Sequence, residues 1–176
     1  VLFGAFTRLT DSGLGCPDWP GCYGFASPIG ASNHIDVAQT AMPTGPVTTG
    51  KAWIEMVHRY LASGIGALIV VSAVLAWTGR RRQPQAGMVR TALSPWWATF
   101  TLAWVCLQGA FGALTVTMKL FPAIVSLHLL GGMVLLALLQ IQHVAYTDSN
   151  NSQKPPLSRT TLRWVVAIFA LLCLQI

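Results

Sequence analysis

Charge is the scarcest property of this chain. Only 9% of the 176 residues are charged and only five are acidic, with Glu55 the single glutamate. Because soluble globular domains carry about 25% charged residues, this composition excludes an ordinary soluble domain. Hydrophobic residues make up 53% of the chain, and together these figures predict an integral membrane protein.

Charged side chains are entirely absent from three long stretches, residues 60–79, 96–118 and 120–146. A helical membrane span needs about 20 apolar residues, so each stretch can cross a bilayer. Backbone groups in lipid must be satisfied within helices or closed barrels, and apolar runs this long exclude barrel strands. We therefore predict an all-α integral membrane protein, an antiparallel bundle of transmembrane helices. The apolar segments 1–6 and 164–176 are expected to be membrane helices truncated at the two ends of the chain.

The basic residues predict how the helices are oriented. Loops rich in lysine and arginine stay on the cytoplasmic side of a membrane, and two such loops occur, at residues 80–95 and 147–163. This assignment places residues 10–51 outside, as an ordered or semi-ordered loop and not a span. A nucleic-acid-binding patch is the alternative explanation, and so apolar a chain disfavours it. The basic residues of the two loops are Arg80, Arg81, Arg82, Arg90, Lys154, Arg159 and Arg163.

This topology divides the chain into three predicted parts. Residues 1–146 form a four-helix bundle with the outer loop, residues 147–163 a cytoplasmic linker, and residues 164–176 the start of a second bundle. Small residues are expected where helices, or a helix and a flat ligand, approach closely. The candidates are Gly109, Gly112, Gly131 and Gly132.

Ionisable residues occur at the mouth of the first span, in the segment "WIEMVHR". Glu55 and His58 are three residues apart and share a helical face. Ionisable groups in membrane helices are costly and usually face the bundle interior or a cavity. The alternative is an interfacial ion pair between Glu55 and Arg59, four residues apart, with His58 an incidental neighbour.

A second histidine, His128, lies at the same predicted depth as His58. The two residues are about seven and five residues from the outer ends of their helices, hence roughly 8–11 Å deep at 1.5 Å per residue. Two histidines at matched depth suit axial ligation of a haem iron from opposite sides. The alternative for His128 alone is a hydrogen-bonded core residue. His143, near the inner end, is left structural, and His34 in the outer loop is unassigned.

The segment "GCPDWPGC" carries two cysteines on the oxidising side of the membrane. A disulfide between Cys16 and Cys22 is the default there. The sequence contains no C-x-x-C-H segment, so covalent haem attachment is not indicated. A zinc site that also uses His34 and Asp36 is the less favoured alternative.

Three segments in combination, "GAFTRLTDSGLGCPDWPGC", "WIEMVHR" and "SLHLLGG", resemble the haem A synthase family of membrane enzymes, which oxidise haem O to haem A. The family fold is two similar four-helix bundles in one chain. By this resemblance the sequence supplies the amino-terminal, substrate-haem bundle and the start of the fifth helix. The carboxyl-terminal half, where the family binds haem B, is absent here.

The resemblance also implies roles for individual residues. His58 and His128 match the histidines that bracket the iron of haem O, and Glu55 matches a carboxylate near the porphyrin edge. That carboxylate would stabilise positive charge or take a proton while a ring methyl is converted to a formyl. Cys16 and Cys22 match the outer-loop cysteine pair of the family.

Further expectations concern haem capture, partners and location. Arg59 and Arg8 are candidate partners of the haem propionates, with snorkelling to the interface as the alternative for Arg8. Haem O, membrane lipid, haem O synthase and an electron acceptor are the expected partners; a homo-oligomer is left open, and nucleic acid is not expected. The expected location is the bacterial cytoplasmic membrane.

Two other functions compete with the oxidoreductase. A non-catalytic, cytochrome b-like electron-transfer subunit explains both histidines but gives Glu55 no task. A transporter or assembly protein whose ionisable residues line a path leaves the depth-matched histidines and the cysteine pair unexplained.

Overall fold

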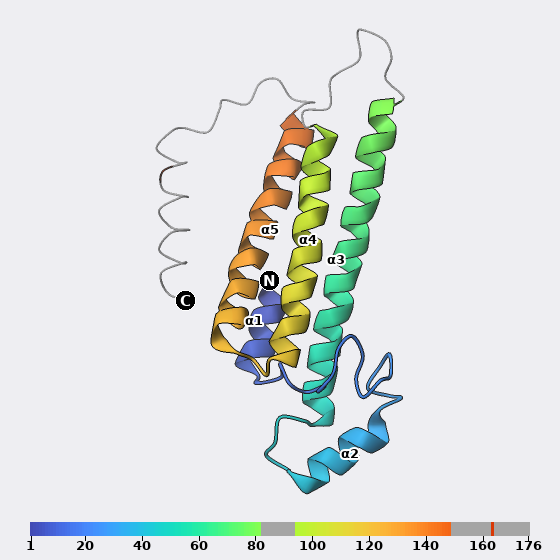
Figure 1. Cartoon of the computed structure of the whole chain (residues 1–176), viewed down its shortest axis with the longest axis vertical. Coiled ribbons are helices and arrows are strands. Elements are labelled where there is room, and N and C mark those ends of the chain that lie inside the picture. Colours follow the sequence, from blue (N-terminus) through green and yellow to red (C-terminus); the bar gives the residue numbers. More distant parts are fainter. Residues whose placement is uncertain (82–93, 149–162, 164–176) are drawn as a thin grey trace.

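A computed structural model describes residues 1–81, 94–148 and 163, and the regular structure in these residues is helical (Figure 1). The predicted all-α class is therefore confirmed. The helices in chain order are α1 (Leu2–Leu9), α2 (Ser32–Ala41), α3 (Thr49–Arg81), α4 (Pro95–Thr117) and α5 (Pro122–Asp148).

Three of these helices are long and apolar enough to cross a membrane, over Thr49–Gly79, Pro95–Thr117 and Pro122–Tyr146. The second and third agree with the predicted spans, whereas the first begins well before residue 60. Thr48 explains this start, because its side-chain oxygen accepts a hydrogen bond from Lys51 N at 3.3 Å and caps the helix. The segment "WIEMVHR" therefore lies within α3.

Two predictions fall largely outside the described residues. The cytoplasmic linker is described only at residues 147, 148 and 163, and the helix start at 164–176 is not described. Arg82 and Arg90 of the first basic loop also fall outside the described residues. The division of the chain into these parts stays a prediction.

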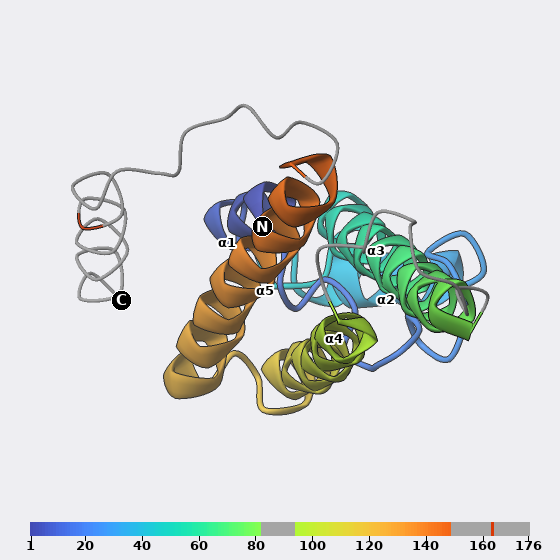
Figure 2. The same cartoon turned by 90° about the horizontal axis from the view of Figure 1, so that it is seen from above.

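The long helices form a bundle in which α4 packs against both α3 and α5 (Figure 1). α3 and α5 run in the same direction, and each is antiparallel to α4. The short helix α1 packs against α3 and lies beside α5 when the bundle is seen from above (Figure 2). The predicted antiparallel bundle is therefore completed by α1 as a fourth member.

Proline and two left-handed residues set the tight connection between α4 and α5. Lys119 and Leu120 have φ of 50° and 59°, and Leu120 N donates to the Thr115 carbonyl at 2.8 Å. This turn resembles the left-handed ends of many helices. Pro122 then opens α5, where its missing N–H costs no helical hydrogen bond.

The outer loop is ordered and contains a helix of its own, α2. At ten residues, α2 is too short to span a bilayer, so the prediction that this region is not a span holds. The loop and α2 pack on the first turns of α3 around a small core. Its buried members are Cys16, Cys22, Ala31, Ile35, Ala52 and Met56.

Gly15 lies where the loop meets α3 most closely, and we predict that Gly15→Ala displaces the loop. A Cβ at this position would lie 2.6 Å from Ala52 N and from the Lys51 carbonyl oxygen, which is closer than real Cβ contacts. Overpacking of this kind commonly costs about 1–3 kcal/mol. Thermal unfolding in detergent should show a lower melting temperature for Gly15→Ala.

Gly50→Ala is the matched control, since nothing lies within 4 Å of a Cβ built there. Equal melting temperatures for the two variants would contradict the close docking of the loop.

Candidate functional site

A disulfide joins Cys16 and Cys22, as predicted, and closes a small ring of residues 16–22. Both cysteines are completely buried. The zinc alternative fails because the disulfide uses both thiols. His34 is instead stacked on Tyr23, with ring centroids 5.4 Å apart and planes inclined by 14°.

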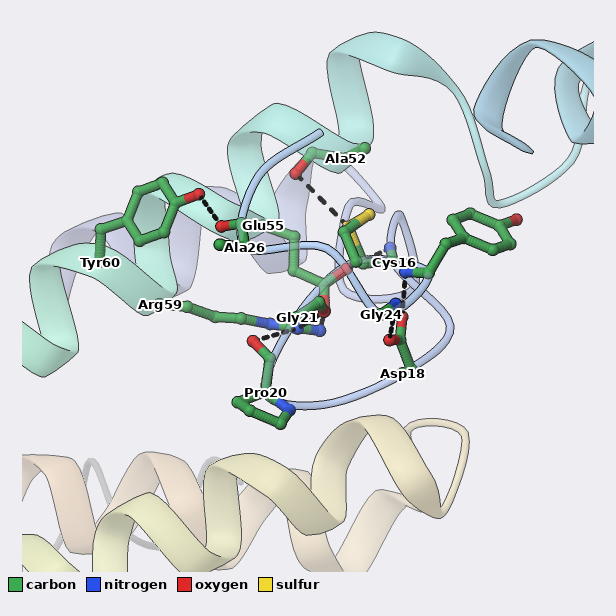
Figure 3. The surroundings of a disulfide bond; sticks show 12 residues. Cys16, Asp18, Pro20, Gly21, Gly24, Ala26, Ala52, Glu55, Arg59 and Tyr60 are labelled. Carbon is green, nitrogen blue, oxygen red and sulfur yellow. Dashed lines mark hydrogen bonds and ion pairs between the residues drawn. A yellow bond between two sulfur atoms is a disulfide. The ribbon is translucent and has the colours of Figure 1, made fainter. Parts of the chain in front are cut away.

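Glu55 and Arg59 form an ion pair on successive turns of α3, and the ring of residues 16–22 binds both partners (Figure 3). Cys16 N donates to Glu55 Oε2 at 2.8 Å. Arg59 Nη1 donates to the carbonyl of Pro20 at 3.2 Å and to that of Gly21. Glu55 is only 3% exposed, so its charge is compensated by Arg59 and by the ring rather than by water.

Further hydrogen bonds fix the shape of the outer loop. The Asp18 carboxylate accepts from Tyr23 N at 2.6 Å and from Gly24 N at 2.7 Å. Gly24 has φ of +77°, a conformation that favours glycine. Tyr60 Oη donates to the Ala26 carbonyl at 2.6 Å and attaches the part of the loop that precedes α2 to α3.

The two candidate ligands lie on different helices of the bundle, His58 on α3 and His128 on α5. Each ring also faces a glycine on another helix. A Cβ built on Gly4 of α1 would lie 3.1 Å from His58 Nε2, and one on Gly112 of α4 would lie 3.8 Å from His128 Nε2. All four helices of the bundle therefore contribute to the surroundings of the two imidazoles.

These residues fit a haem held by two histidines. His128 Nδ1 is buried without a hydrogen-bond partner in the described part of the chain, and a ligating histidine uses this nitrogen to donate to a second-shell acceptor. Among the described residues, no group of three His, Cys, Asp or Glu side chains could hold a bare metal ion. A porphyrin needs only two axial protein ligands, because its own nitrogens supply the others.

The other predicted residues, Arg8, Arg59 and His143, make no described contact with His58 or His128. Arg8 is exposed near the end of α1, and the Arg59 side chain is engaged with Glu55 and the ring, so a propionate role for either stays a prediction. His143 is exposed and follows His128 by 15 residues, about 22 Å along the helix, in agreement with a role apart from the pair.

Sequence reasoning missed two features of the site. The first feature is the contact of α1 with His58, which was not predicted. Gly4 faces the imidazole, and the Phe3 ring is stacked on it with centroids 6.3 Å apart. The second feature is the pair of main-chain carbonyls that accept hydrogen bonds from Arg59. The sequence could not indicate them, because every residue has a carbonyl group. Gly112 was predicted to lie at a close approach, and it faces His128.

Comparison with known proteins gives one consistent result. Residues 1–176 match the family model described as cytochrome oxidase assembly protein, COX15-CtaA. The chain is 37% identical over 169 residues to a protein named "Heme A synthase" from Shewanella oneidensis, covering 92% of this chain and 48% of that protein. It is 27% identical over 162 residues to "Heme A synthase" from Alkalihalophilus pseudofirmus, covering 90% of this chain and 46% of that protein.

The chain spans about half the length of the curated relatives it matches. No solved structure gives a significant match.

The geometry of the ion pair predicts that Glu55→Ala is strongly destabilising. It would leave Arg59 half-buried without its counter-charge and Cys16 N without its acceptor. Removing one partner of a buried pair typically costs about 3–5 kcal/mol. A lower melting temperature and faster reduction of the disulfide by dithiothreitol should both be measured.

Asp11→Asn provides the control for a simple loss of charge, because asparagine tolerates the left-handed φ of 52° at this position. It removes the exposed pair with Lys51, at 3.1 Å, and exposed pairs contribute about 0.2–1 kcal/mol. If both variants melt and reduce alike, the buried pair does not hold the ring on α3.

Proposed function

The chain belongs to the COX15-CtaA family of cytochrome oxidase assembly proteins, and we propose that it forms the substrate-haem half of a haem A synthase. The observation that carries this proposal is the pair of histidines, His58 and His128, held in one bundle with a glycine of another helix opposite each ring. The names of the similar proteins support the same function.

In this proposal the substrate is haem O, held by His58 and His128 as the axial ligands of its iron. The reaction hydroxylates a ring methyl successively with oxygen from water and removes two electrons and two protons each time. The resulting geminal diol then loses one water to give the formyl of haem A. It therefore needs an electron acceptor. The family resemblance implies a haem B in the carboxyl-terminal half that would relay the electrons to this acceptor.

Glu55 is proposed to assist this oxidation from a fixed position one turn from His58. Removing electrons from the methyl develops positive charge, which a preorganised carboxylate stabilises. Both carboxylate oxygens already have partners, Arg59 at Oε1 and Cys16 N at Oε2. This engagement favours electrostatic stabilisation over acceptance of a proton. Arg8 and Arg59 remain candidates for binding the propionates.

We place the protein in a bacterial cytoplasmic membrane, because the similar proteins come from bacteria. Residues 10–51 would lie outside, with 80–95 and 147–163 in the cytoplasm, following the basic residues. Haem O synthase is the proposed source of the substrate, and a homo-oligomer is compatible with this arrangement.

One observation favours the alternative of a cytochrome b-like electron-transfer subunit. Glu55 already has a structural task, so it no longer demands a chemical one. Extraction and chromatography of the pigment from the full-length protein separates the two functions. Haem O, a hydroxylated product or haem A supports the synthase, and haem B alone supports the electron-transfer subunit.

We predict that His58→Ala and His128→Ala each abolish the low-spin bis-imidazole spectrum of the haem bound in this half. Each substitution removes one of two axial ligands, which leaves the iron five-coordinate or releases it. Electron paramagnetic resonance of the full-length protein provides the measurement. His143→Ala is the control and should retain the signal, and an unchanged spectrum in His128→Ala would refute the assignment.

We predict that Glu55→Gln binds haem but slows its conversion or stalls it at a hydroxylated intermediate. Glutamine keeps the size and a hydrogen-bond acceptor for Cys16 N but removes the negative charge. Losing such a contact in the transition state commonly costs roughly 10²–10⁴-fold in rate. Haem content and haem A yield should be measured on the same preparation of the full-length enzyme.

A purely structural Glu55 gives a different result. Stability would then fall, while the yield of haem A per bound haem would equal that of the unmodified enzyme.

A further inference from the structure

A polar side chain, Gln108, is buried at the contact between α4 and α5. It is 7% exposed, and its Oε1 atom has no hydrogen-bond partner among the described residues. Burying an amide oxygen without a partner is unfavourable. Buried polar residues within membrane helices usually mark a function, so Gln108 calls for an explanation beyond packing.

The position of Gln108 is set by a glycine of the facing helix. Its Nε2 atom occupies the place that a Cβ on Gly131 of α5 would need. Trp104, one turn from Gln108 on α4, donates from Nε1 to the Gly131 carbonyl at 2.9 Å and fixes the same approach. The absence of a side chain at residue 131 thus allows the amide to lie between the helices.

Gln108 and His128 lie on adjoining turns of this helix contact. On α4, Gly112 faces the His128 ring and is four residues from Gln108. On α5, Gly131 faces Gln108 and is three residues from His128. Residues three and four apart share a helical face, so the glutamine and the histidine occupy neighbouring places in one interface.

The unpartnered atoms of these two residues are chemically complementary. Among the described residues, His128 Nδ1 is buried without a hydrogen-bond partner that has good geometry, and so is Gln108 Oε1. The Gln108 main chain lies within hydrogen-bonding reach of the His128 ring and is a competing acceptor. When Nε2 of a histidine binds a metal, Nδ1 carries the proton and acts as a donor. An amide oxygen is an acceptor for that proton.

We propose that Gln108 is a positioning residue for His128, whose Nδ1 proton its amide oxygen accepts. This bond would fix the tautomer and the orientation with which Nε2 meets the haem iron. The inference rests on the proposed function, since it needs His128 to be an iron ligand. A role in packing alone would affect stability but not the electronic properties of the bound haem.

Two substitutions in the full-length protein separate these roles. Gln108→Met keeps the length of the side chain and removes the acceptor, whereas Gln108→Glu keeps an acceptor oxygen. The protein is titrated with ferric haem B, and the signal that is lost in His128→Ala identifies the haem of this site. The g values and the reduction potential of this haem are then measured for each variant.

Gln108→Met should bind haem about 10- to 100-fold more weakly, the usual effect of losing a second-shell partner. Its reduction potential should become more positive, because an imidazole without an acceptor at Nδ1 donates less electron density to the iron. Gln108→Glu should shift the potential in the opposite direction, because a carboxylate accepts more strongly than an amide. Gln140→Met, at an exposed position on α5, should change neither property.

Unchanged g values and potentials in both Gln108 variants, whatever their melting temperatures, would overturn the proposal. If Gln108→Met does not fold, Gln108→Glu alone decides, and a wild-type potential refutes the positioning role. If the unmodified protein gives no low-spin signal that depends on His128, the proposed function fails and this inference fails with it.

Discussion

The buried ion pair between Glu55 and Arg59 is the interaction on which the outer part of the structure depends. A carboxylate removed from water is stabilised only by a close counter-charge and by hydrogen bonds to its remaining lone pairs. Arg59 supplies the charge and Cys16 N the hydrogen bond, while the carbonyls of Pro20 and Gly21 accept from Arg59. These three main-chain groups all belong to the ring that the disulfide closes, so the charges are satisfied only when that ring is seated on α3.

This constraint extends to the candidate ligand His58. The disulfide-closed ring of residues 16–22 packs on α3, and α3 carries His58 three residues after Glu55. On its amino-terminal side the ring is connected to α1, whose residues Gly4 and Phe3 lie against the His58 imidazole. Ser12 N, between α1 and the ring, donates to the Thr7 carbonyl at 2.9 Å and continues this attachment. The rotation of α3 relative to α1, and hence the direction of the His58 ring, is therefore linked to the docking of the outer loop.

The sequence predicted those features that depend on local composition or on compartment. Missing charge located the spans, and the predicted location of Cys16 and Cys22 on the oxidising side of the membrane indicated their disulfide. The start of α3 at Thr49 was not predictable from hydropathy, because Glu55 and Arg59 interrupt the apolar run. These two residues neutralise each other, and their burial depends on tertiary hydrogen bonds to the ring. Spacing alone also left two hypotheses for Glu55, since residues 58 and 59 both share its helical face. Tertiary contacts show that the pair with Arg59 forms.

The distribution of the candidate site over four helices has an energetic consequence. His58 lies on α3 opposite a glycine of α1, and His128 lies on α5 opposite a glycine of α4. No two of these helices provide both imidazoles together with their surroundings, so in the proposed function a haem held by both histidines would bind only the assembled bundle. A ligand with this preference stabilises the assembled state, by about 2.7 kcal/mol when its free concentration is 100 times its dissociation constant. In the proposed function, arrival of the substrate and consolidation of the bundle are therefore one linked equilibrium, and release of the product must reverse part of that stabilisation.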